Sequence, residues 1–171
     1  MIHWQAHDFD HPFGPDYVQR TFTVGGSLYN VAFTKIHTLA ELKAWHADPT
    51  QISPALTVMP ANSVGCVMFD KITPDYNNNF QHVMELSGLQ AVKVIRSVAR
   101  AVYDHYTVCK SALYMWVAAK DTARRRKRDL TEIYDAILGF NHKTATCIPL
   151  TTSVNHLCTD RRGYAIITSY V

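Results

Sequence analysis

Apolar and polar side chains alternate in one stretch near the start of the chain, and two glycines follow it. The alternation covers residues 18–24 and is typical of a strand with one buried face. Gly25 and Gly26 supply the backbone freedom of a tight turn, and residues 28–33 continue as a returning strand. The pattern predicts an antiparallel hairpin.

The next segment carries a helix start signal and then several prolines. Thr38 is a suitable N-cap residue, and Glu41, three residues later, completes a capping box. We expect a short helix from Thr38 to about Ala47. The loop predicted after it contains three prolines: Pro49, Pro54 and Pro60.

The middle of the chain changes from strand patterns to the spacing of a long helix. Residues 64–69 and 80–86 are predicted strands, joined by an Asn-rich polar turn over residues 73–79. After Gly88, apolar residues recur at three- and four-residue intervals, from Leu89 to Tyr106. This spacing is typical of an amphipathic helix with one side in the core.

The remaining pattern predicts a strand, a helix and two more strands. Residues 112–119 form an apolar run without alternation, as in a central strand covered on both faces. Residues 124–138 carry a helical apolar stripe that ends at Gly139, and residues 144–150 and 164–170 are predicted strands. We therefore expect a single α/β domain with one mixed, twisted sheet of about seven strands, helices on its faces and locally parallel pairing across residues 80–150.

Length and composition agree with one domain. The 171 residues suit a single core, and residues 1–17, which are rich in histidine and aromatic residues, are expected to form an irregular arm. The chain has neither an apolar run of membrane-helix length nor an N-terminal signal-peptide pattern. Cys66, Cys109 and Cys147 lie in or beside apolar runs. We expect buried thiols and a cytoplasmic protein.

The net charge of +3 is unevenly distributed. Five consecutive positions are basic: Arg124, Arg125, Arg126, Lys127 and Arg128. This cluster predicts a local anion site for a coenzyme phosphate, a nucleic-acid backbone or an acidic protein, and a solvated helix turn is the alternative. No aromatic residues interrupt it, so nucleic acid is not the favoured partner.

His3, His7 and His11 recur every four residues, but Pro12 disfavours the helix that would align them for a metal.

One stretch combines a turn glycine, two helices and a tyrosine motif. A predicted strand ends near Glu85, Ser87-Gly88 forms the turn, and the long helix and the apolar strand follow. The next helix contains Ile133-Tyr134 and, after a spacer, Gly139-Phe140. Over residues 64–150 this series resembles the GNAT (N-acetyltransferase) superfamily, whose corresponding helix ends in a pattern close to L-Y-x-x-x-G-F, one residue shorter in the spacer.

The resemblance implies an acyl-coenzyme-A-dependent N-acyltransferase. In this superfamily the start of the first of these helices binds the coenzyme's pyrophosphate, a splayed pair of strands holds its pantetheine arm, and the tyrosine protonates the departing thiolate. Four residues would line the phosphates: Gly88, Leu89, Gln90 and Ala91. Acetyl-coenzyme A would be the donor, Tyr134 the general acid and Glu85 the base for an amine substrate.

Several residues leave a different function class open. Family members show Gln or Arg, two residues, Gly, one residue, then Gly or Ala, and here Glu85 and Gln90 replace the usual outer residues. Tyr134 lies on the apolar stripe of its helix, where a core tyrosine is the alternative. The chain is also similar to small tailed-phage proteins at three places: Val117-Ala118-Ala119, Arg128 and Ile133-Tyr134. The alternative function is a catalytically silent viral protein that acts by binding, as a virion component or an inhibitor of a host factor.

Overall fold

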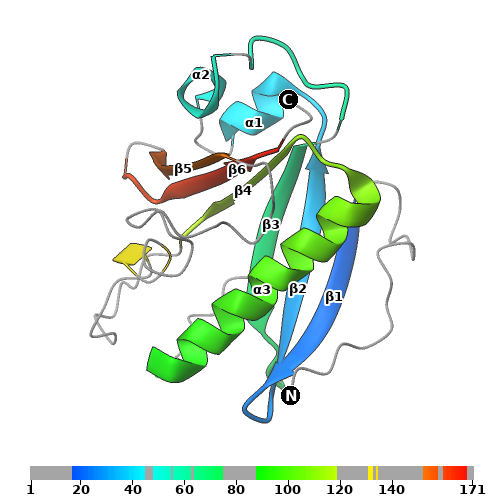
Figure 1. The fold of residues 1–171 in the computed structure, drawn as a ribbon, viewed down its shortest axis with the longest axis vertical. Coiled ribbons are helices and arrows are strands. Elements are labelled where there is room, and N and C mark those ends of the chain that lie inside the picture. The colour runs from blue at the N-terminus through cyan, green and yellow to red at the C-terminus, as the bar shows by residue number, and fades with distance from the viewer. Residues whose placement is uncertain are drawn as a thin grey trace.

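The computed structural model describes residues 17–44, 48–54, 56–62, 64–74, 88–118, 131, 132, 134, 152–157 and 160–168. Within these ranges the chain forms one mixed sheet of six strands with helices on both faces (Figure 1). The strands are β1 (Tyr17–Val24), β2 (Ser27–Ile36), β3 (Val64–Lys71), β4 (Leu113–Val117), β5 (Thr152–Leu157) and β6 (Gly163–Ile167). The helices are α1 (Leu39–Ala44), α2 (Pro49–Ile52) and α3 (Gly88–Cys109). The expected α/β class with a mixed sheet is confirmed.

The predicted hairpin is present as β1 and β2. The two strands pair antiparallel from Tyr17 opposite Thr34 to Val24 opposite Ser27. Gly25 and Gly26 form the turn with φ of 58° and 78°, a left-handed backbone that glycine adopts without steric cost. The strand includes Tyr17, so the expected irregular arm is one residue too long at its end. Residues 1–16 lie outside the described part of the chain.

The capping box predicted for α1 is present. The Thr38 hydroxyl accepts a hydrogen bond from the Glu41 backbone N–H at 3.1 Å, and the Glu41 carboxylate accepts one from the His37 backbone N–H at 2.8 Å. The prediction of an unbroken loop around Pro49 is wrong, because α2 forms there. The Asp48 side chain caps α2 by accepting from the Thr50 N–H at 3.0 Å, and proline is well tolerated in a first helical turn.

The sheet order is β1-β2-β3-β4-β6-β5. Neighbouring strands pair antiparallel except β3 and β4, which are parallel. The helix α3 lies between β3 and β4 in the chain. The parallel pairing expected across residues 80–150 stays a prediction, because it involves strands at 80–86 and 144–150. The predicted strands at 80–86 and 144–150 fall outside the described residues. The described sheet also contains β5, which the sequence pattern did not predict.

Each face of the sheet buries its own set of helices. On the α3 face, Val94, Ile95, Val98 and Val102 of α3 pack on side chains of β1, β2, β3, β4 and β6. On the opposite face, Leu42 of α1 and Ile52 of α2 pack on β2, β3, β4, β5 and β6. Tyr114 and Trp116 of β4 point to the first cluster, and Leu113 and Met115 point to the second. The prediction of a central strand covered on both faces is confirmed.

Two predictions about burial are corrected by the structure. Cys66 is buried, and its burial raises the pKa of the thiol to about 12, but Cys109 is exposed at the end of α3. Leu89 belongs to the predicted apolar stripe of α3 but is 71% exposed, since it lies in the first turn of the helix, beside Gly88. None of the described helices is long and apolar enough to cross a membrane.

Candidate functional site

The most distinctive feature of the sheet is the separation of β3 from β4. The two strands pair at only three positions, from Val64 opposite Leu113 to Cys66 opposite Met115. Beyond these pairs β3 continues beside β2 as far as Lys71, and β4 continues beside β6 as far as Val117. Figure 1 shows the strands diverging from their start near α1. The sheet is therefore continuous where β3 and β4 pair, and beyond these pairs the two strands diverge. We call the region between the diverging strands the opening, with β1, β2 and β3 as one half of the sheet and β4, β5 and β6 as the other.

Tyr134 lies over this opening on the α3 face. Residues 131, 132 and 134 are helical, and Tyr134 is only 4% exposed. Its ring centroid lies 6.4 Å from that of Phe69 on β3, 6.2 Å from Trp116 on β4 and 5.3 Å from Tyr164 on β6. The tyrosine of the predicted motif thus contacts aromatic rings of both halves of the sheet.

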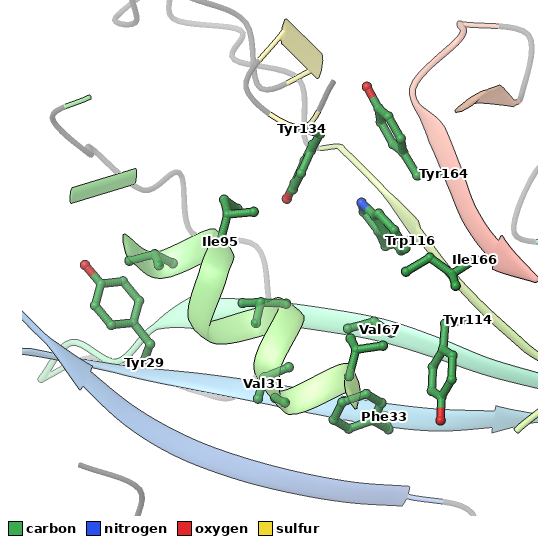
Figure 2. Packing of buried hydrophobic residues seen from close by; sticks show 14 of the residues in the cluster. Tyr29, Val31, Phe33, Val67, Ile95, Tyr114, Trp116, Tyr134, Tyr164 and Ile166 are labelled. Atoms are coloured by element: carbon green, nitrogen blue, oxygen red, sulfur yellow. The ribbon is translucent and has the colours of Figure 1, made fainter. Parts of the chain in front are cut away.

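The helical turn that carries Tyr134 is attached to β6. The Tyr164 hydroxyl donates a hydrogen bond to the backbone carbonyl of Thr131 at 3.2 Å. The Tyr164 ring stacks on Trp116 with centroids 5.7 Å apart and an interplanar angle of 9°, as expected for directly opposite residues on neighbouring strands. Tyr134, Trp116 and Tyr164 form a group that we call the aromatic cluster. Figure 2 shows it facing Val67 and Ile95.

An apolar cavity lies between the aromatic cluster, β3 and α3. Its volume is about 30 Å³, in the measure by which a single water needs roughly 10–15 Å³. The sheet contributes Val67 and Phe69 from β3, Trp116 from β4 and Ile166 from β6, and α3 and Tyr134 supply the other lining residues. The cavity is therefore at the place where β3 and β4 have separated.

The indole nitrogen of Trp116 is a buried donor within the aromatic cluster, and the cavity itself is lined by apolar surface alone. The nitrogen has no hydrogen-bond partner in the described part of the structure, and the residue is only 8% exposed. Figure 2 shows the nitrogen on the edge of the indole nearest the Tyr134 and Tyr164 rings. Leaving a buried donor without a partner costs about 1–3 kcal/mol.

The four residues expected to line a pyrophosphate have different surroundings. Gly88 and Leu89 are the first two residues of α3, and the Leu89 side chain is exposed. Ala91 is 2% exposed and belongs to the core. The Gln90 amide nitrogen lies next to the β1–β2 turn. It would be 2.7 Å from a Cβ atom placed on Gly25. The first turn of α3 thus combines an exposed start with a buried side.

The other predicted site residues lie outside the described ranges. These are Glu85 and the cluster of Arg124, Arg125, Arg126, Lys127 and Arg128. Their expected roles stay predictions. No group of three or more His, Cys, Asp and Glu side chains in the described ranges is arranged to hold a metal, and His3, His7 and His11 are outside those ranges.

A buried polar pair lies next to the place where β3 and β4 still pair. His105 of α3 and Tyr114 of β4 share a hydrogen bond of 2.7 Å between Nδ1 and the hydroxyl oxygen. Phe33 stacks on the imidazole with centroids 4.3 Å apart. Burial lowers the pKa of His105 to about 4 and raises the pKa of Tyr114. The pair is therefore neutral at pH 7 and links α3 to β4.

The sequence motif predicted Tyr134 as a site residue, and no sequence pattern predicted its aromatic neighbours. Phe69, Trp116 and Tyr164 come from three different strands, and nothing in their spacing indicates a common site. The strands that carry these residues are rich in apolar and aromatic side chains, and this composition predicted only that the strands are buried. No family model, no curated protein and no solved structure matches this chain.

Proposed function

We propose that this protein is a GNAT-like N-acyltransferase, or a derivative of that fold, that binds an acyl thioester of coenzyme A between β3 and β4. The observation that carries the proposal is the position of Tyr134. The resemblance implies that this residue is a general acid, and its ring lies across the opening between two parallel strands that pair at only three positions.

The connectivity supports the same proposal. The parallel strands β3 and β4 are separated in the chain by α3, and β6 then pairs antiparallel with β4. In the proposed family such a splayed strand pair holds the pantetheine arm. The start of α3 at Gly88 follows β3 in the chain, and a helix N-terminus offers free backbone N–H groups and a favourable dipole to a phosphate.

The chain's own residues would perform limited and specific tasks. Bound coenzyme would supply a thioester, whose carbonyl carbon an amine substrate would attack directly. The hydroxyl of Tyr134 would hold the proton that the departing sulfur takes up, a role typically worth 10²–10⁴ in rate. The aromatic cluster and α3 exclude water from the opening, since their side chains are buried and apolar. Glu85 is the proposed base for the amine.

Binding and transfer are tested separately. At 100 times its Kd, acetyl-coenzyme A should stabilise the fold by about 2.7 kcal/mol and raise the unfolding temperature by about 5–10 °C. The shift should persist in moderate salt. Thiol release in the presence of primary amines should fall about 10²–10⁴-fold in Tyr134→Phe, and this variant should still bind. Absence of any shift or thiol release in the wild type would contradict the proposal.

One observation favours a second candidate function, a catalytically silent binding protein that kept the fold. Tyr134 is 4% exposed and contacts three aromatic rings, which is also how a core residue packs. In that case Tyr134→Phe would leave every biological activity unchanged, and acetyl-coenzyme A would give no shift. Capture of a partner by the wild-type chain but not by a surface variant would then define the function.

A further inference from the structure

The side of α3 that faces away from the sheet is basic. The helix has three basic residues, Lys93, Arg96 and Arg100, and its single acidic residue is Asp104. All three basic side chains are exposed, and their spacing of four and three residues places them on one line along the helix. We call these three residues the basic stripe. None of the described helices and strands covers the outer side of α3 in Figure 1.

The basic stripe lacks the acidic partners that usually balance such a helix face. Lys93 and Arg96 form no ion pair with a carboxylate in the described part of the chain. Like charges three or four residues apart destabilise a helix, whereas opposite charges at this spacing stabilise it. The whole chain is nearly balanced, with 17 basic and 14 acidic residues, so the imbalance is local. The stripe therefore carries a net positive charge that an external anion can neutralise.

The contacts of Arg100 hold its side chain in place without cancelling the positive charge. Its Nε lies 2.8 Å from the Asp104 carboxylate, which also binds Arg20 of β1 at 3.0 Å, so two guanidinium groups share one carboxylate. The Arg100 guanidinium carbon lies 5.3 Å from the centre of the Tyr103 ring. An arginine held through Nε and an aromatic ring still presents its terminal N–H groups, which bind phosphate oxygens in pairs.

The composition of the stripe favours the phosphate groups of DNA over other polyanions. Protein interfaces centre on apolar side chains, and membrane-surface helices bury large apolar residues. Proteins that bind double-stranded RNA also contact its 2′-hydroxyl groups. From Lys93 to Arg100 the only exposed positions of α3 are the three basic ones. They span about 10 Å of helix, and each strand of duplex DNA carries one phosphate per about 3.4 Å of axis, so the stripe matches about three phosphates.

We infer that the basic stripe binds the phosphate backbone of double-stranded DNA. The inference goes beyond the proposed function, because it uses neither Tyr134 nor the opening between β3 and β4. Three side chains on three phosphates release bound counterions, so the logarithm of the association constant should fall with the logarithm of the salt concentration with a slope of about −2.7. This slope corresponds to about 40-fold weaker binding at 200 mM than at 50 mM salt. Contacts to phosphates carry no sequence information, so duplexes of different sequence should bind equally.

Fluorescence anisotropy with a labelled DNA duplex at several salt concentrations measures this slope. The double variant Lys93→Gln/Arg96→Gln removes two charges at exposed positions, so the chain should still fold, which thermal unfolding checks. Its slope should fall to about −0.9, the value for one remaining phosphate contact. Lys43→Gln is the matched control, since Lys43 is exposed on α1, on the opposite face of the sheet, and this variant should keep the wild-type slope.

Four results would overturn the inference. The first is the absence of binding to duplex DNA at 50 mM salt. The second is a wild-type slope in the double variant, which would place the contact elsewhere, for example at residues 124–128. The third is a preference for one duplex sequence. The fourth is tighter binding of the stripe to an RNA duplex, an acidic peptide or a vesicle of anionic lipid than to duplex DNA.

Discussion

The ring of Tyr134 stands edge-on to the ring of Phe69, with centroids 6.4 Å apart and an interplanar angle of 89°. Phe69 belongs to β3, in one half of the sheet, and the other aromatic neighbours of Tyr134 belong to β4 and β6, in the other half. One side chain therefore connects two groups of strands at the point where they stop pairing. Stability and the proposed chemistry depend on the same residue, and substitutions can separate the two.

The first prediction concerns the packing of Tyr134. Tyr134→Ala should lower the free energy of unfolding by about 3–5 kcal/mol, because a large buried ring is removed from an aromatic cluster. Tyr134→Phe should lower it by about 1 kcal/mol or less, because only the hydroxyl is lost. Urea unfolding of both variants measures the difference. Equal stabilities of the two variants would mean that the ring does not pack as described.

The second prediction concerns the pH dependence of stability. Burial lowers the pKa of His105 from 6.5 to about 4. Between these values the unfolded chain takes up a proton at His105 and the folded chain does not, so stability falls as the pH is lowered through this window. The loss should reach about 3 kcal/mol and level off below about pH 4.

Urea unfolding at a series of pH values measures this loss. His105→Gln is the matched control, because glutamine can still hydrogen-bond to Tyr114 and does not titrate. The variant is expected to be less stable overall, since it loses the stacking on Phe33, but its stability should lack the His105 contribution to the pH dependence. The same slope in wild type and variant would show that other groups cause it.

The third prediction compares two ion pairs that share one carboxylate. Asp104 of α3 binds Arg20 of β1 at 3.0 Å and Arg100 of α3 at 2.8 Å. Side-chain exposure is 17% for Arg20 and 62% for Arg100. Because exposed pairs contribute little, Arg100→Gln should cost about 0.5 kcal/mol or less, and Arg20→Gln should cost more, about 1–2 kcal/mol. Chemical denaturation of the two variants provides the comparison, and equal losses would contradict the role of burial.

Local patterns predicted the elements whose formation depends on local rules. The Gly25-Gly26 turn, the Thr38–Glu41 capping box and the helical spacing of α3 all act within a few residues, and all three are present. The apolar run at β4 predicted burial on both faces because a central strand has no solvent face to alternate with.

Other features could not be read from the sequence because they depend on distant parts of the chain. Among the described strands, β5 lies at the edge of the sheet beside β6, and its sequence, Thr152–Leu157, is too polar to give an apolar strand pattern. The short helix α2 depends on one capping side chain, Asp48. The opening between β3 and β4 arises from where their pairing ends. The motif predicted Tyr134 as a site residue, but its aromatic neighbours on β3, β4 and β6 come together only in the folded sheet.

The most direct test of the central claim is amide hydrogen exchange with and without saturating acetyl-coenzyme A. If the ligand binds in the opening, exchange should slow in residues 67–71 of β3, 116–118 at the end of β4 and 131–134, and stay unchanged at the Gly25-Gly26 turn. Unchanged exchange at all of these segments, or protection confined to another part of the chain, would contradict a donor site between β3 and β4.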